Sequence, residues 1–372
     1  MELLNATKML ASYTMGVDKA GRESLVVVIK GTYQLPMDGN SQNEEAKLAD
    51  QQQPLVEADQ FSGEPGYSAA LYESEYAPFK PRCDVLLNGS AYAPDGKPAG
   101  SVEAGFKLST ISKVIKVVGN RLWYTGGGGG ISITKAHPFV KMNITYDVAF
   151  GGMDNFHSDP SKHDAYMPNP VGRGFHRNLT NDLVHNTPLP NTEERGKAIK
   201  NPDGSYKPVA FGPLGRGWAD RLQYAGTYDQ KWIDDVFPFL PADFDDRYFQ
   251  AAPADQQCDY LKGGELVQLL NLTASGSAAF RIPNADMPVV FFRKRGGDEH
   301  KQAVIDTLLI EPEKGVFSIV WRCSLPLKKN MFEIPQVLVG NKSRAWWRAR
   351  TLGKTYYKSL ADIASSKGDN DD

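Results

Sequence analysis

The chain has 372 residues, of which 41% are hydrophobic and 23% are charged, an ordinary composition for a globular protein. Its formal net charge of −2 gives no overall field that would attract nucleic acid or an anionic membrane, and no apolar run reaches the roughly 18 residues of a membrane helix. Cys83, Cys258 and Cys323 are odd in number and far apart, so we expect neither a disulfide framework nor a CxxC zinc site.

The first part of the chain is dominated by strand patterns. Its opening 16 residues, MELLNATKMLASYTMG, lack the basic start and apolar core of a signal peptide, so we expect a cytoplasmic protein. Residues 24–35 (SLVVVIKGTYQL) are rich in β-branched residues and predict a strand, and a polar loop is expected after it over 38–53. Shorter strand patterns occupy residues 82–94 and 101–125. This spacing is typical of an antiparallel sandwich or barrel-like sheet.

The middle of the chain, residues 151–262, differs from both ends. It is rich in Pro, Gly, Asn, Asp and aromatic residues and shows little periodicity, so we expect a long loop-rich region. Two short helices are predicted at DQKWIDDVF (229–237) and DFDDRYFQ (243–250), each with an aspartate near its N-cap.

Strand patterns return in the last third of the chain, over residues 264–275, 278–283, 288–295, 303–314 and 315–326, where EPEKG predicts a hairpin turn. We expect a mainly β family domain over 1–345, with two packed β lobes (about 1–150 and 263–340) bridged by 151–262. Residues 346–372 are predicted to form a short C-terminal helix and a disordered acidic tail.

One stretch, residues 226–257 (GTYDQKWIDDVFPFLPADFDDRYFQAAPADQQ), concentrates acidic and aromatic residues. Paired carboxylates beside aromatic rings are typical of glycoside hydrolases, and a carbohydrate-active hydrolase using paired aspartates in 226–259 is our alternative hypothesis. No spacing specifies a catalytic pair, however, and aspartates beside prolines and aromatic residues commonly cap short helices and turns. The acids concerned are Asp229, Asp234, Asp235, Asp243, Asp245, Asp246, Asp255 and Asp259.

A second candidate lies in residues 154–178, where His157, Asp159, His163, Asp164 and His176 offer metal-ligand chemistry. Their spacing matches no HExxH or facial-triad pattern. In a loop rich in proline and glycine, hydrogen-bonding histidines are the simpler interpretation, and we predict no metal or other cofactor.

Near the C-terminus, SRAWWRAR (343–350) alternates arginines with Trp346 and Trp347. Such a pattern is found at partner-binding and nucleic-acid-binding surfaces. It also fits a helix that docks its tryptophans on the body and leaves its arginines in water. Both interpretations stay open at this point, with partner binding the preferred functional one.

Five phrases in order carry a resemblance to a known family: YDVAFGG (146–152), NPVGRGF (169–175), VAFGPLGRGWADR (209–221), residues 226–257, and LKGGELVQLLNL (261–272). Together they resemble a bacterial type VI secretion accessory family, a domain of unknown function encoded beside toxic effector, VgrG and PAAR genes. The resemblance covers about residues 5–340. It implies an adaptor or chaperone, not an enzyme, that binds a cognate effector and helps load it onto the VgrG or PAAR spike while staying in the producing cell.

On this interpretation the 226–257 stretch is a semi-rigid surface. Its prolines limit backbone freedom, and its aromatic rings offer a large contact area with few rotatable bonds. We expect several of its aspartates to pair with Arg216, Arg221 and Arg247, and we place variable effector recognition in loops 38–60 or 176–206. The partner-binding or scaffold candidates are Trp218, Tyr228, Trp232, Phe237, Phe239, Phe244, Asp229, Asp243, Arg221, Arg247, Trp346 and Trp347.

Overall fold

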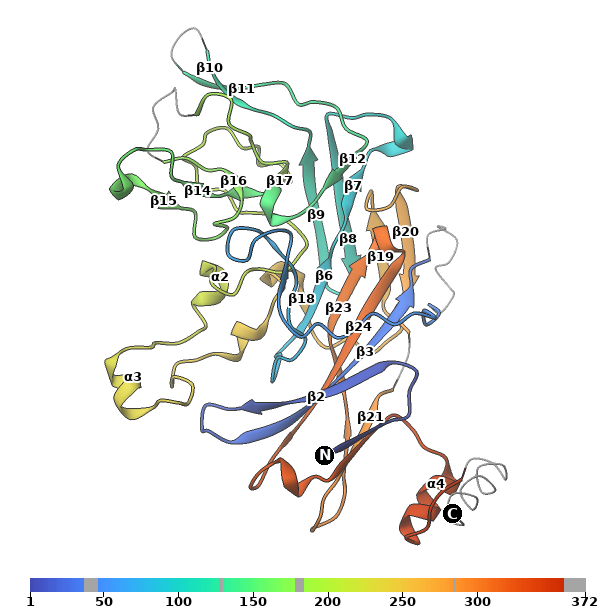
Figure 1. The fold of residues 1–372 in the computed structure, drawn as a ribbon. Coiled ribbons are helices and arrows are strands. Elements are labelled where there is room, and N and C mark those ends of the chain that lie inside the picture. The colour runs from blue at the N-terminus through green and yellow to red at the C-terminus, as the bar shows by residue number, and fades with distance from the viewer. Residues whose placement is uncertain (37–45, 127–129, 178–183, 284–285, 358–372) are drawn as a thin grey trace, which may run out of the picture.

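The computed structural model describes residues 1–36, 46–126, 130–177, 184–283 and 286–357, and it is mainly β, as predicted. Figure 1 shows an elongated body of crossing strands from which a loop-rich region, carrying two short helices, projects to one side. The helices of the described residues are α2 (Ala219–Leu222), α3 (Gln230–Asp235) and α4 (Arg344–Thr351).

The largest sheet has six strands in the order β18-β6-β23-β24-β3-β2. Neighbouring strands are antiparallel except β6 and β23, which are parallel. The long central pair, β24 and β3, stays in register from Val316 opposite Gln34 to Pro326 opposite Ser24. The strands are β18 (Gln257–Cys258), β6 (Cys83–Leu87), β23 (Val304–Glu311), β24 (Val316–Pro326), β3 (Glu23–Gln34) and β2 (Leu10–Val17).

Two further sheets complete the body. The five-stranded sheet runs β17 (Thr192–Glu194), β9 (Ile111–Val118), β8 (Ser101–Leu108), β19 (Leu266–Leu270), β20 (Ser277–Arg281). The four-stranded sheet runs β1 (Glu2–Asn5), β25 (Gln336–Val339), β21 (Pro288–Phe292), β22 (Glu299–Gln302). All three sheets combine strands from both ends of the sequence, so the segments 1–150 and 263–340 interleave within shared sheets.

Short strand pairs and 3-10 turns organise the remaining loops. The two-stranded pairs are β4 (Gln60–Phe61) with β5 (Ala70–Tyr72), β7 (Ser90–Tyr92) with β12 (Lys141–Asn143), β10 (Trp123–Thr125) with β11 (Ile131–Ile133), β13 (Phe150–Gly151) with β16 (Arg173–Gly174), and β14 (Met153–Asp154) with β15 (Asp164–Ala165). The 3-10 turns are η1 (Pro94–Gly96), η2 (Tyr146–Val148), η3 (Pro160–Lys162), η4 (Asp246–Phe249), η5 (Ala254–Gln256), η6 (Pro312–Lys314) and η7 (Met331–Glu333).

Several local expectations can be compared with these elements. The strand over 24–35 and the EPEKG turn are confirmed as β3 and as η6 followed by Gly315 in the left-handed region. The segment 243–250 was expected to be helical but forms only the single 3-10 turn η4. The polar loop over 38–53 lies partly outside the described residues; its second half runs beside β3, where Gln34 N–H donates to Lys47 O at 2.8 Å.

The main hydrophobic core lies between the sheets. It takes side chains from the six-stranded sheet and from the other two, including Val27, Phe106 and Val337, all of them buried. Contact between sheets is direct at Phe280 of β20 and Phe317 of β24, whose rings stack with centroids 4.6 Å apart. Burial alternates along β9, as expected for a strand with one face in a sandwich core, whereas β3, β6, β23 and β24 are buried on both faces over most of their length.

The loop-rich region is fixed to the outer part of the six-stranded sheet by polar side chains. Asp84 of β6 is fully buried and accepts hydrogen bonds from Gln250 Nε2 (2.5 Å), from the backbone N–H of Ala251 (2.8 Å) and from Lys80 Nζ (2.8 Å). Gln256, also fully buried, donates through Nε2 to the carbonyl oxygen of Val85 on the same strand at 2.7 Å. These bonds anchor the chain around Gln250 and Gln256 to β6.

We predict that Asp84→Ala destabilises the protein by about 3–5 kcal/mol, because it leaves the buried Lys80 ammonium without its counter-charge. Urea unfolding measures the loss. The matched control is Asp259→Ala, whose side chain is 99% exposed and lies 3.6 Å from Arg82; its effect should stay below about 0.5 kcal/mol. Equal destabilisation by the two changes would contradict the anchoring role of Asp84.

Candidate functional site

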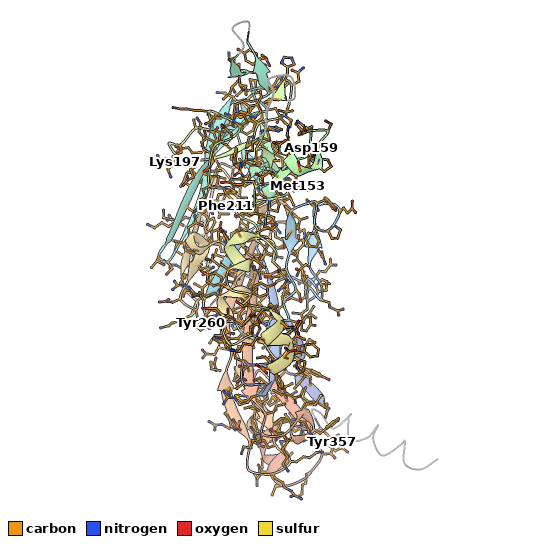
Figure 2. All side chains as sticks on the ribbon, turned by 90° about the vertical axis from the view of Figure 1, so that its left-hand side faces the viewer. Met153, Asp159, Lys197, Phe211, Tyr260 and Tyr357 are labelled. Carbon is orange, nitrogen blue, oxygen red and sulfur yellow. The ribbon has the colours of Figure 1, made fainter. Side chains whose placement is uncertain are left out.

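The most prominent feature of the loop-rich region is an arm, residues 226–246, which contains α3 and projects from the body (Figure 1). Figure 2 views the molecule from the side toward which the arm projects. We call this segment the aromatic arm, because it exposes the rings of Tyr228, Phe237 and Phe239.

The arm is held in shape by its own acids. Asp229 caps α3 by accepting the N–H of Trp232 at 2.9 Å, as the sequence predicted. Asp243 closes the base of the arm by accepting the N–H (3.0 Å) and the hydroxyl (2.7 Å) of Thr227, bonds that lower the pKa of its carboxyl. The indole Nε1 of Trp232 donates to Phe239 O at 2.9 Å and links the two sides of the arm.

The arm exposes four large apolar side chains. Tyr228, Ile233, Phe237 and Phe239 expose between 46% and 66% of their surface. The half-buried Trp232 supports two of them, with its ring centroid 4.7 Å from that of Tyr228 and 5.6 Å from that of Phe237. Large rigid rings at this degree of exposure are typical of protein-binding anchors, since a free surface gains little by presenting them to water.

The arm also rests on the turn between β2 and β3. A Cβ atom built on Gly21, whose φ is +73°, would lie 2.7 Å from Cε1 of Phe239, so glycine lets the ring approach. Asp245 binds Arg247 through two side-chain contacts of 3.0 and 2.7 Å, which lower its pKa to about 2, with a smaller contribution from Lys19 of the same turn. The arm therefore has a fixed place beside the end of β2.

Two aromatic candidates belong to the interior. Phe244 is buried against Tyr248 and Phe249, with centroids 5.8 and 5.5 Å away. Trp218 is buried edge-on against Tyr146 at 5.1 Å. These residues fit the scaffold interpretation rather than the anchor interpretation.

The three arginines make different contacts from those expected. Only Arg247 pairs with an aspartate of the acidic stretch, Asp245. Arg221 is buried instead, and donates to the carbonyl oxygens of Leu214 (3.0 Å) and Tyr248 (2.7 Å) and to Glu73 Oε1 (2.7 Å). Its partners lie on three separate segments, so it holds the base of the arm to the segment that precedes β6.

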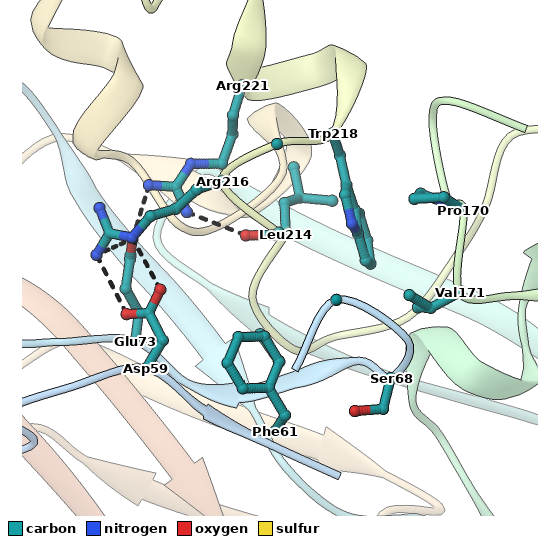
Figure 3. A pocket seen from close by; sticks show the side chains of 14 residues that line it. Asp59, Phe61, Ser68, Glu73, Pro170, Val171, Leu214, Arg216, Trp218 and Arg221 are labelled. Carbon is teal, nitrogen blue, oxygen red and sulfur yellow. Dashed lines mark hydrogen bonds and ion pairs between the residues drawn. The ribbon is translucent and has the colours of Figure 1, made fainter. Parts of the chain in front are cut away.

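Arg216 completes this network at the end of a cavity of about 330 Å³ (Figure 3). It forks onto Asp59 with distances of 2.8 and 3.2 Å and reaches Glu73 Oε1 at 2.8 Å. Burial raises the pKa of Asp59 and the bonds from Arg216 and the Ser74 N–H lower it, with a net downward shift. Two carboxylates face two guanidiniums here, while Phe61 and Trp218 supply apolar walls.

Another acid of the stretch serves the scaffold through lysines. Asp255 contacts Lys113 Nζ at 3.0 Å and Lys207 Nζ at 2.7 Å. Burial lowers the pKa of Lys113 to about 8, and its attraction to Asp255 only partly offsets this. Lys113 also donates to Gln256 Oε1 at 2.7 Å, which ties β9 to the same amide that binds β6.

The histidine segment is organised by hydrogen bonds. His157 Nδ1 accepts the N–H of Asp159 at 3.0 Å, His163 Nε2 lies 2.7 Å from His157 O, and Asp164 pairs with Arg177 at 2.5 Å. Within the residues that the structure describes, no group of three or more His, Cys, Asp or Glu side chains is arranged to hold a metal ion.

The basic–aromatic segment forms α4. Trp346 and Trp347 are half-buried and pack against Phe292 of β21, with centroids 6.4 and 5.9 Å away, and the Arg350 guanidinium lies 3.5 Å from the centroid of the same ring. The tryptophans therefore dock the helix on the body. The predicted tail beyond residue 357 lies outside the described residues, and no helix within them is long and apolar enough to cross a membrane.

Three residues of the site were not singled out from the sequence. Ile233 is one apolar position in a short exposed helix and gave no periodic signal. Asp59 lies 157 residues from Arg216, and Glu73 lies 148 residues from Arg221, so no local spacing could have paired them.

Comparison with known proteins identifies a family for this chain. Residues 20–322 match the model of a family described as an uncharacterized protein conserved in bacteria (DUF2169), and the chain belongs to that family. No curated protein and no solved structure matched it. The match includes β3, the cavity and the whole aromatic arm, so these features lie inside the family domain.

We predict that Arg221→Ala lowers the free energy of unfolding by about 3–5 kcal/mol, because it leaves the carbonyl oxygens of Leu214 and Tyr248 without their buried donor and removes one of the two guanidiniums that bind Glu73. Arg247→Ala removes a pair exposed to solvent and should cost less than about 1 kcal/mol. Chemical denaturation of both variants distinguishes the two roles, and comparable losses would show that Arg221 does not hold the arm's base.

Lys113 provides a test by pH. Its pKa is lower in the folded chain than in the unfolded one, so the unfolded state binds more protons between about pH 8 and pH 10.5, and stability contributed by this group rises over that window. The free energy of unfolding of the wild type relative to Lys113→Met should therefore increase as the pH is raised from 8 to 10. A flat or falling difference would contradict a lowered pKa of Lys113 in the folded chain.

Proposed function

We propose that this family member is an adaptor or chaperone that binds a cognate toxic effector in the bacterial cytoplasm and helps load it onto the VgrG or PAAR spike of a type VI secretion system. The proposal rests on the resemblance of the five phrases and on one structural observation: an aromatic surface displayed on a braced arm. The protein acts by binding another polypeptide, and the arm is the surface that makes first contact.

The bracing supports a binding role because a preorganised surface loses little conformational entropy on association. Asp229, Asp243 and the indole of Trp232 fix the arm without help from a partner. The exposed rings of Tyr228 and Phe237 are then free to enter a partner's pocket. Such central aromatic anchors usually carry most of the binding energy of an interface.

The hydrolase hypothesis has different requirements, since it needs two carboxylates facing a cleft at roughly 5–10 Å. Four acids of the stretch are engaged in other contacts: Asp229 and Asp243 accept backbone N–H groups, Asp245 pairs with Arg247, and Asp255 pairs with two lysines. These bonds favour a structural use of the acids, and we therefore develop the adaptor proposal alone.

We predict that the triple variant Tyr228→Ser, Ile233→Ser, Phe237→Ser loses at least tenfold in affinity for the effector encoded beside its gene, with little change in thermal stability, because the three side chains are exposed. Co-expression followed by copurification, and then titration calorimetry, measures the loss. The control is Tyr67→Ser with Phe332→Ser, each 70% exposed and outside the arm.

Retention of effector affinity by the arm variant would contradict the arm as the binding surface. Failure of the wild-type chain to bind that effector at all would contradict the adaptor proposal itself.

A further inference from the structure

The six-stranded sheet ends in a strand whose outer edge is open. β2 pairs with β3 from Leu10 opposite Lys30 to Val17 opposite Glu23, and it is the last strand on that side of the sheet. Within the described residues, no hydrogen bond beyond the pairing with β3 involves a backbone group of residues 10–17. Half of the strand's backbone donors and acceptors therefore point outward without a protein partner.

This edge lacks the features that normally block strand addition. Its sequence, LASYTMGV, contains no charged residue and no proline, and Leu10, Met15 and Val17 are exposed. Proteins usually protect such an edge with charges, proline or a very short strand. An eight-residue uncharged edge is therefore a notable exception.

The other outer strands of the three large sheets do carry protection. β17 (TEE), β22 (EHKQ), β20 (SAAFR) and β1 (ELLN) are shorter and contain charged residues, and β18 has only two residues. The contrast within one molecule singles out β2 as the edge suited to accept another strand.

The open edge leads toward the aromatic arm. β2 ends at Val17, and the turn after it contains Gly21, on which the ring of Phe239 rests. In Figure 1 the arm lies on the same side of the molecule as this turn. An extended chain paired with β2 would thus pass from the edge to the arm in a few residues, at about 3.3 Å per residue.

The arm also indicates the charge of its partner. Residues 226–246 contain six aspartates and one lysine. Asp234 and Asp235 of α3 are exposed and form no ion pair with a described residue; Asp234 accepts only the Gln230 amide, at 2.9 Å. Two such carboxylates beside apolar rings favour a partner with lysine or arginine near its apolar anchors.

We propose that the effector supplies an extended segment that adds to the outer edge of β2 as a seventh strand, with an uncharged stretch on the edge and basic residues next to the arm. This inference rests on the proposed adaptor function for the identity of the partner. Main-chain hydrogen bonds along the edge provide affinity with little demand on sequence, and the arm selects the effector residues adjacent to the added strand.

The first test is hydrogen exchange of the full-length chain with and without the neighbouring effector. We expect amides within Leu10–Val17 to exchange at least tenfold more slowly in the complex, because the outward-facing N–H groups acquire acceptors. A complex that forms without any change in this segment would overturn strand addition. Protection of the segment in the free chain, together with a dimeric mass, would assign the edge to a second copy and would also overturn it.

The second test uses overlapping 15-residue peptides of the effector. In the peptide that binds, single N-methylation should weaken binding at least tenfold at alternate positions only, since a strand directs every second N–H toward its neighbour. If the loss of affinity caused by N-methylation shows no period of two along the peptide, main-chain pairing is contradicted.

Charge variants separate this inference from the proposed function. Met15→Glu and Met15→Lys should both weaken binding, because either charge is desolvated beside a paired edge, whereas simple attraction of a basic segment would make Glu bind tighter. Phe332→Glu is the control for an added charge elsewhere. If both Met15 variants bind normally while the arm triple variant does not, the edge inference fails and the adaptor proposal stands.

Discussion

The structure depends on the way one side of its largest sheet is closed. β6 has a full partner, β23, on one side, but on the other side it meets only the two residues of β18. Loop groups complete the missing contacts: Gln256 Nε2 donates to Val85 O, and Phe211 O accepts the N–H of Leu87. The side chain of Asp84 also accepts hydrogen bonds from Gln250, Ala251 and Lys80. Because an unsatisfied buried polar group is costly, loss of the hydrogen bonds made by the Gln250 and Gln256 amides would destabilise the sheet.

That constraint explains how a long segment poor in aliphatic residues keeps a defined shape. Residues 200–262 have little core of their own, yet their two buried glutamines, Gln250 and Gln256, hold them to β6. At the base of the arm, the Arg221 guanidinium donates hydrogen bonds to the carbonyl oxygens of Leu214 and Tyr248 and to the carboxylate of Glu73. Polar anchoring of this kind leaves the outer aromatic residues unneeded for folding, and they are the ones exposed to solvent.

The sequence was most informative where an interaction is local or where the residue types of a segment favour a strand. β3 and β24 are rich in β-branched residues, and Asp229 and Asp245 act on N–H groups two or three residues away, so these features could be predicted. β2 could not, since LASYTMGV has weak strand propensity and forms by pairing with β3. The Arg216–Asp59 fork spans 157 residues and leaves no trace in local spacing. The prediction that Arg216 and Arg221 pair with aspartates of the 226–257 stretch was wrong, because these arginines bind Asp59 and Glu73 instead.

The two edges of the six-stranded sheet therefore differ in how their outward-facing backbone groups are satisfied. On the β6 side, the chain satisfies the outer backbone groups with β18, the Gln256 amide and the carbonyl oxygen of Phe211. On the β2 side it leaves the outer edge of an uncharged eight-residue strand without a hydrogen-bonding partner among the described residues, although charges protect most of the other outer strands of the molecule. A sheet edge left open in this way risks unwanted association, so its retention next to a braced aromatic arm is most simply explained if a partner strand regularly covers it. On this view the closed side provides the rigidity that the open side requires, since an edge can select a strand only if the sheet behind it does not move.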